Sequence, residues 1–223
     1  MIKGCLFDLD GTLLNTLTTI RYYLNETLEK FGYKTISEEQ TKKFVGHGAK
    51  NLIETTLNAV GADLSKEENK PLFNNVYDDY IERYNADSAY LTEAYDGIKE
   101  LIDVMKNRGL KLAVISNKPD TNVKELIDIN FPNTFDIVEG ATDRMPLKPV
   151  ADWPRDILKR LSLDPSEVIY VGDTSTDMQT AKNFGAAVAV GVLWGFREKD
   201  ELLLNGADVI VSHPLEIAKL LDR

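Results

Sequence analysis

Two aspartates, Asp8 and Asp10, directly follow the apolar stretch Cys5-Leu6-Phe7 and precede Gly11. The apolar stretch predicts a buried strand that the glycine ends. Because side chains alternate along a strand, two carboxylates two residues apart share one face if the strand persists. Two negative charges this close repel each other, and a bound cation relieves the repulsion. An Asp-Gly turn alone is common, so the rest of the chain decides whether this stretch carries chemistry.

Three further segments place polar side chains after an apolar run or in a loop before a helical pattern. They are Ser116-Asn117-Lys118 after the run 111–115, Lys148 between Pro146 and Pro149, and Asp173 with Asp177 after the run 168–171. The spacing of Asp173 and Asp177 puts both near one face of a starting helix turn. In open α/β sheets, ligand sites form outside the carboxyl ends of the strands. Together the segments predict a site for phosphate and a metal ion.

These segments closely resemble the four motifs of the haloacid dehalogenase superfamily of aspartate-nucleophile phosphatases. The matching residues are Asp-x-Asp-Gly-Thr-Leu at 8–13, Ser-Asn-Lys at 116–118, Lys-Pro at 148–149 and Gly-Asp-x-x-x-Asp at 172–177. The stretch 192–210 is similar to the tail of the phosphoglycolate-phosphatase-like branch. Asn15 stands where many relatives carry Asp, outside the four motifs. Ala151 stands where many carry a second proline, which we expect to alter loop stiffness more than chemistry.

The residue types and the resemblance together indicate the catalytic roles. Asp8 is the expected nucleophile, which attacks phosphorus and forms an acyl phosphate. Asp10 is the expected general acid–base, which protonates the leaving oxygen and then takes a proton from the attacking water. Lys148 offers a positive charge to the nucleophile and to the transferring phosphoryl group.

Mg²⁺ is the expected cofactor, because it prefers hard oxygen ligands. Asp8 and Asp173 are the expected carboxylate ligands, and Asp177 is expected to orient metal-bound water. The resemblance implies that Asp10 contributes its backbone carbonyl. The expected phosphate contacts are Ser116, the backbone amide of Asn117 and Thr12.

Four residues near these motifs have a less direct interpretation. Lys118 follows a strand, where a lysine is usually solvated. His47 lies between Gly46 and Gly48, which let a loop approach a ligand closely. An isolated histidine is more often structural, but related proteins contact the substrate through this loop, so we include His47 in the substrate site. Trp194 is expected to pack, and the role of Arg197 stays open.

The segment 16–85 has a helical pattern and no convincing strand. Apolar residues recur at helical spacing from Leu17, Ser37 is a candidate helix N-cap, and a longer helix is expected over 65–83. We therefore predict an inserted α-helical cap domain at 16–85 and a core domain made of 1–15 and 86–223. Linkers near 14–17 and 85–95 would act as a hinge, so that the cap closes over the site.

The remainder of the chain alternates strands with helices. Helices are expected at 97–108, 121–129, 152–161, 175–184 and 215–221, and strands at 111–116, 137–138, 168–171, 187–190 and 208–211. This alternation predicts an α/β fold with a Rossmann-like parallel sheet covered on both faces.

Composition narrows the class of partner. The 223 residues carry a net charge of −10, with 43% hydrophobic and 28% charged residues. The acidity disfavours nucleic acid and anionic membranes as partners. The expected partner, a small phosphate ester, is what the motifs and the resemblance imply. Cys5 is the single cysteine, and the first residues lack a long apolar signal region, so we expect a cytoplasmic protein. Monomer and weak dimer both stay open.

The leading hypothesis is a Mg²⁺-dependent phosphomonoesterase for a small metabolite, with phosphoglycolate as the first guess from the resemblance. A sugar phosphomutase similar to β-phosphoglucomutase, or a nucleotidase or pyrophosphatase, would use the same carboxylates. A phosphate-accepting signalling or binding protein without turnover is the alternative of a different class. The long insertion and the spacing of Asp8 and Asp10 speak against a signalling receiver domain.

Overall fold

The computed structural model describes residues 1–64, 66, 69–144 and 146–222. Its centre is a six-stranded parallel sheet in the order β5-β4-β1-β6-β7-β8. The strands are β1 (Gly4–Phe7), β4 (Lys111–Pro119), β5 (Ile137–Ala141), β6 (Val168–Gly172), β7 (Val188–Val192) and β8 (Val209–Val211). The predicted parallel α/β sheet is confirmed, with β4 running three residues beyond its expected end.

Helices cover both faces of this sheet. They are α5 (Ile98–Asn107), α6 (Asp120–Asn130), α7 (Asp152–Leu161), α8 (Ser175–Phe184), α9 (Lys199–Leu204) and the 3₁₀ helices η2 (Pro165–Glu167) and η3 (Pro214–Leu220). Alternate residues of β1 enter different cores, since Phe7 packs with α5 and α6 whereas Leu6 packs with α7 and α8. The last expected helix is a 3₁₀ helix, and α9 was not predicted.

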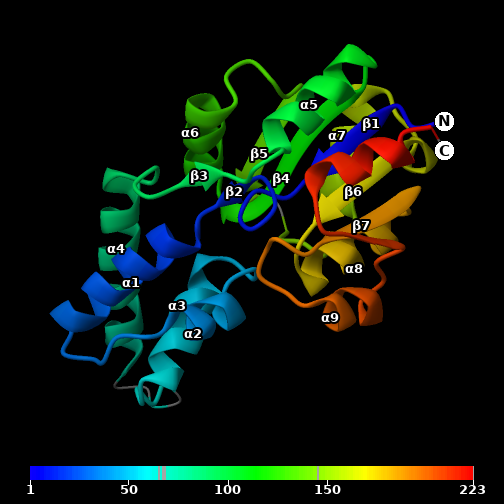
Figure 1. Cartoon of the computed structure of the whole chain (residues 1–223). Helices are drawn as coiled ribbons and strands as arrows, with labels where there is room; N and C mark the ends of the chain where they lie inside the picture. The colour runs from blue at the N-terminus through cyan, green and yellow to red at the C-terminus, as the bar shows by residue number, and fades with distance from the viewer. Residues whose placement is uncertain (65, 67–68, 145, 223) are drawn as a thin grey trace.

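Four helices form a separate group beside the sheet (Figure 1). They are α1 (Leu17–Lys30), α2 (Glu38–Phe44), α3 (Ala49–Ala59) and α4 (Lys70–Ala86). They enclose an apolar cluster of their own, which includes Leu24, Leu28, Ile53 and Val76. Ser37 begins α2 as predicted, with a capping box. The expected helix start at Ser65 lies outside the described residues.

Two short strands join this helical group to the sheet. β2 (Leu14–Asn15) pairs antiparallel with β3 (Glu93–Ala94), so the two connecting segments lie side by side. The predicted linkers thus form one small sheet directly after the loop that carries Asp10. Among the described residues, no helix is both long and apolar enough to cross a membrane.

Candidate active site

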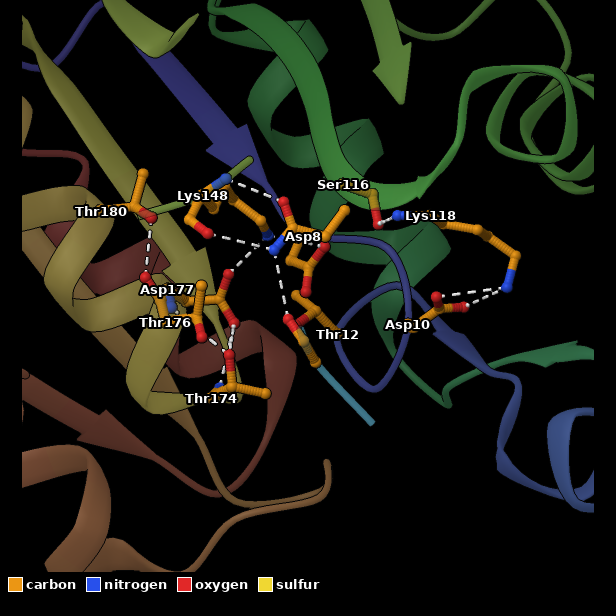
Figure 2. Close-up of polar contacts among 12 residues, drawn as sticks. Asp8, Asp10, Thr12, Ser116, Lys118, Lys148, Thr174, Thr176, Asp177 and Thr180 are labelled. Atoms are coloured by element: carbon orange, nitrogen blue, oxygen red, sulfur yellow. Dashed lines mark hydrogen bonds and ion pairs between the residues drawn. The ribbon is translucent and has the colours of Figure 1, made fainter. Parts of the chain in front are cut away.

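The carboxyl ends of three neighbouring strands bring the sequence motifs together. In the sheet, Phe7 at the end of β1 lies beside Val114 of β4 and Val171 of β6. The residues that follow these positions therefore meet at one edge, where Asp8 lies close to Lys148 and Asp177 (Figure 2).

Lys148 lies between two carboxylates at this edge. Its Nζ is 2.9 Å from Asp8 Oδ1 and 2.7 Å from Asp177 Oδ1. The side chains of Lys148, Asp8 and Asp177 are all buried, with exposed fractions of 2%, 9% and 0%. Burial lowers the pKa of Lys148, but the charges of Asp177 and Asp8 outweigh it and hold that pKa well above its ordinary value. Lys148 is therefore a permanent cation beside the expected nucleophile.

One lysine does not balance the negative charge of this cluster. Burial, and then repulsion by Asp177, raise the pKa of Asp8 to about 7, although Lys148 opposes the shift. Burial and the charges of Asp177 and Asp8 also raise the pKa of Asp173 well above its ordinary value. One oxygen from each of the three aspartates lies within 4.8 Å of the others. Three buried hard-oxygen ligands with unbalanced charge fit a divalent cation such as Mg²⁺.

Asp173 is held in place from two sides. Thr12 donates its hydroxyl to Asp173 Oδ1 at 3.0 Å, and the Phe196 amide donates to Oδ2 at 2.8 Å. Gly11 has a φ of +81°, and a Cβ there would lie 2.3 Å from Asp173 Oδ2. A Cβ at Gly195 would lie 2.3 Å from Asp173 Cβ. These contacts fix the orientation of the Asp173 carboxylate. The Thr12 hydroxyl, which is expected to contact phosphate, donates to Asp173 in this structure.

Asp177 has a structural partner as well as a charged one. The amide and hydroxyl of Thr174 donate to Asp177 Oδ2, at 3.0 and 2.6 Å, in the capping box that begins α8. Its Oδ1 accepts from Lys148 and, at 3.2 Å, from the Tyr170 hydroxyl. The helix cap thus fixes the orientation of a carboxylate at the edge of the site.

Asp10 stands apart from the cluster and pairs with Lys118. Lys118 Nζ donates to both Asp10 carboxylate oxygens, at 3.1 and 3.2 Å, and lies 4.4 Å from the centre of the Tyr84 ring. Figure 2 shows this pair on the other side of Asp8 from Lys148 and Asp177. The expectation that Lys118 is solvated is wrong, because β4 continues past it and Tyr84 of α4 covers it.

The Asn117 side chain joins two loops by hydrogen bonds, and this role was not predicted from the sequence. Its Oδ1 accepts from the Lys148 amide at 2.8 Å. Its Nδ2 donates to the carbonyls of Lys148, at 3.3 Å, and Gly46, at 3.2 Å. Ser116, beside it, is buried, and its hydroxyl accepts from the Lys118 amide at 3.4 Å. Asn117 therefore links the lysine loop to the loop between α2 and α3.

A small cavity of about 60 Å³ joins these groups to the helical segment. The sheet side contributes Asp8, Asp10 and residues 116–119, and the helical side is largely apolar, with Ile20, Leu52 and Tyr80 among its residues. Pockets that bind small molecules usually have several hundred Å³. The cavity is therefore small in this conformation, and a ligand of metabolite size must displace part of its wall.

His47 lies outside the residues that line this cavity. Gly46 and Gly48 contribute to the cavity wall, whereas His47 lines a neighbouring cleft of about 580 Å³. The His47 Nδ1 is 3.3 Å from the hydroxyl of Thr176 in α8. The role of His47 at the substrate stays a prediction, and the cleft is the place where its ring would act.

Comparisons with known proteins agree with this arrangement. The sequence pattern of the haloacid dehalogenase-like hydrolases matches residues 5–191. A phosphoglycolate phosphatase of Aquifex aeolicus is 30% identical, over 99% of this chain and 97% of its own. An N-acetylmuramic acid 6-phosphate phosphatase of Pseudomonas aeruginosa is 29% identical, over 100% of this chain and 96% of its own. The crystal structure of CbbY from Rhodobacter sphaeroides in complex with phosphate superposes with a TM-score of 0.79, at 25% identity, over 97% of this chain and 96% of its own.

Proposed function

The chain belongs to the haloacid dehalogenase-like hydrolases and is a phosphatase, and from this premise we propose that it hydrolyses a small phosphate monoester through a phosphorylated Asp8. The observation that carries the proposal is the separation of the two motif aspartates. Asp8 lies against Lys148 and the carboxylate cluster, whereas Asp10 faces the cavity with Lys118. This separation supports an attacking role for Asp8 and a proton-transfer role for Asp10.

In the first step, an oxygen of Asp8 attacks the phosphorus, and the bond from phosphorus to the leaving oxygen breaks. Asp10 gives its proton to that oxygen, so an alcohol leaves and Asp8 carries an acyl phosphate. Lys148 balances the charge of the nucleophile and of the transferring group. Ser116 and the Asn117 amide bind phosphate oxygens. Mg²⁺, when held by Asp8, Asp173 and Asp177, would supply further positive charge for the phosphate oxygens.

In the second step, a water oxygen attacks the phosphorus of the acyl phosphate. Asp10, now ionised, takes a proton from that water, and the bond between phosphorus and Asp8 breaks. Inorganic phosphate leaves, and Asp8 is again a carboxylate and Asp10 again protonated. Residues 16–85 act as the cap that excludes bulk water while the first step proceeds.

The phosphate half of the site is shared by every candidate substrate, so the names of relatives guide the choice of leaving group. Phosphoglycolate is the first candidate, because the Aquifex relative bears that name. The Pseudomonas relative is named for a much larger ester, at nearly the same identity. We expect the substrate to be a small metabolite in the cytoplasm.

The test is phosphate release from phosphoglycolate, N-acetylmuramic acid 6-phosphate and p-nitrophenyl phosphate, with Mg²⁺ and with excess chelator. We expect release that depends on Mg²⁺, and acid-stable but base-labile labelling of the wild type, absent in Asp8→Asn. Transfer of phosphate to a sugar without its release would indicate a phosphomutase. Full turnover in chelator, or in Asp8→Asn, would overturn the proposed mechanism.

A further inference from the structure

The segment after β7 is fastened to the catalytic loops at three successive residues. The Trp194 indole donates to the Thr12 carbonyl at 3.0 Å. Gly195 packs against Asp173 so closely that a side chain there would overlap it. The Phe196 amide then donates to Asp173 Oδ2 at 2.8 Å. The backbone that leads to residue 197 is therefore fixed relative to the carboxylate cluster.

The next residue extends from this fixed segment to the helical group. The Arg197 Nη1 donates to the Lys42 carbonyl, and Nη2 donates to the carbonyls of Lys43, at 3.4 Å, and Val45, at 2.8 Å. These carbonyls belong to the last turn of α2 and its C-cap. The helix itself offers no N–H donor to the carbonyls at its C-terminal end, so they need donors from elsewhere. The Arg197 side chain is only 11% exposed. A planar guanidinium is suited to this contact, because its donors diverge in a fixed fork.

The carbonyls that Arg197 binds lead directly into the cavity wall. Val45, Gly46 and Gly48 line the cavity above Asp8 and Asp10. Gly46 has a φ of +110°, and a Cβ there would lie 3.4 Å from the Thr174 side chain. The loop thus rests closely on the sheet domain, with Arg197 holding its first residue.

The Phe196 side chain strengthens the same connection. It is 9% exposed, packs in the apolar cluster of α1 to α4 and also lines the cavity. Adjacent residues of one segment therefore bind the carboxylate cluster, fill the helical core and hold the end of α2. The sheet domain contributes all three contacts from a loop of the chain distant in sequence from the helical group.

We propose that Arg197 is a positioning residue: it holds the loop 45–48 over Asp8 and Asp10 and so sets the closed position of the cap. The effect of Arg197 on turnover rests on the proposed function, whereas its effect on the position of the loop does not. A substrate of metabolite size needs more room than the cavity offers in this conformation. A cap that opens to admit it would break the contacts between Arg197 and α2 and form them again on closing. Arg197 itself lies outside the residues that line the cavity, and it acts through the loop.

Arg197 also forms an ion pair with Glu201, which allows a matched control. Its Nε is 3.3 Å from Glu201 Oε1, one turn along the same surface. If this ion pair were the main role of Arg197, then Glu201→Gln would reproduce the effect of removing the guanidinium. Arg160→Met is a second control, because Arg160 pairs with Glu139 and Asp156 within the sheet domain.

The first experiment measures hydrogen exchange of backbone amides in the wild type, Arg197→Met, Arg197→Lys and the two controls. In Arg197→Met we expect exchange over residues 42–48 to accelerate about tenfold, the low end of what hydrogen bonds to a charged group contribute. Exchange over 112–115 in β4 should not change. Arg197→Lys should fall between, and both controls should match the wild type. Equal acceleration in β4, or none over 42–48, would overturn the inference.

The second experiment compares kcat/KM for an alkyl phosphate and for p-nitrophenyl phosphate. An alkyl leaving group needs the closed site and the proton of Asp10, so Arg197→Met should lose about tenfold on it. The activated aryl ester should lose less, and Arg197→Lys should recover part of the loss. An equal loss on both esters would indicate general damage to the site. If the wild type releases phosphate from no ester, the proposed function fails, while the exchange experiment still tests Arg197.

Discussion

Asp8 and Asp10 are two residues apart in the chain, yet their carboxylates have different lysine partners. Asp8 lies 2.9 Å from Lys148, on the side of the carboxylate cluster, and Asp10 lies 3.1 Å from Lys118, on the side of the cavity. The strand ends at Phe7, so alternation along a strand does not decide where the second aspartate points. This separation gives the two carboxylates distinct environments, which supports the distinct roles that we propose for them.

Replacing Asp8 should abolish turnover and leave the fold intact. Asp8→Asn is nearly isosteric, but an amide does not form the acyl phosphate. We expect kcat to fall by at least about 1,000-fold, as is typical when a nucleophile is removed. Circular dichroism should superpose on that of the wild type. Phosphate release within tenfold of the wild type would contradict the role of Asp8.

Replacing Asp10 should lower kcat/KM most for esters whose leaving group must be protonated as it departs. Asp10→Asn should lose about 100-fold or more on an alkyl phosphate, the usual contribution of a general acid. It should still allow Asp8 to be phosphorylated by p-nitrophenyl phosphate, whose leaving group departs without protonation. The measurement is kcat/KM for both esters in the variant and the wild type. Equal losses would show that Asp10 acts through structure.

Without a divalent cation, the folded protein should lose stability as pH rises from about 4 to about 7. The pKa of Asp8 is about 7 in the folded protein, against an ordinary value of 3.8, because burial and Asp177 disfavour the carboxylate. Over this range the unfolded chain binds fewer protons than the folded chain, so the free energy of unfolding falls with rising pH. The raised pKa of Asp173 acts in the same direction.

Asp8→Asn should remove much of this slope and stabilise the cation-free protein at pH 7, by at most on the order of 4 kcal/mol. The measurement is the free energy of unfolding by urea between pH 4.5 and 8 in the presence of chelator, for the variant and the wild type. Saturating Mg²⁺ should stabilise the wild type more than the variant, since the ion binds the folded state. A difference between the two proteins that does not change with pH would contradict this account.

Much of the fold and the site could be predicted, because local signals agree with the tertiary structure. Apolar runs that end in polar residues became adjacent strands of one parallel sheet, and their carboxyl ends brought Asp8 and Asp173 together. Ser37, followed by Gln40, formed the capping box that its sequence indicates. The short helix α9 was not predicted, because six residues give almost no periodic pattern.

The parts that could not be predicted depend on contacts between distant segments. The burial of Lys118 requires Tyr84, which arrives from a helix in another part of the chain. Arg197 binds backbone carbonyls about 150 positions earlier, and a carbonyl has no signature in the sequence. The role of His47 at the substrate stays a prediction, and its contact with Thr176 of α8, 129 positions later, has no signature in the sequence.

The position of His47 predicts a difference between large and small leaving groups. Its ring lines the 580 Å³ cleft, whereas Gly46 and Gly48 line the cavity above Asp10. A leaving group too large for the cavity would extend past these glycines toward the cleft. His47→Ala should therefore change kcat/KM for N-acetylmuramic acid 6-phosphate by about 3- to 10-fold, comparable to one lost polar contact, and phosphoglycolate much less.

Thr176→Val supplies the matched variant for this prediction, because it removes the hydroxyl 3.3 Å from His47 Nδ1 at nearly constant volume. Without that partner the imidazole is less firmly oriented, so Thr176→Val should shift the ratio of the two kcat/KM values in the same direction, by a smaller factor. The double variant with His47→Ala and Thr176→Val should have nearly the same ratio as His47→Ala alone, since both substitutions act on one contact. If His47→Ala scales both esters equally, or changes neither, then the cleft does not contact the leaving group, and selectivity arises within the cavity.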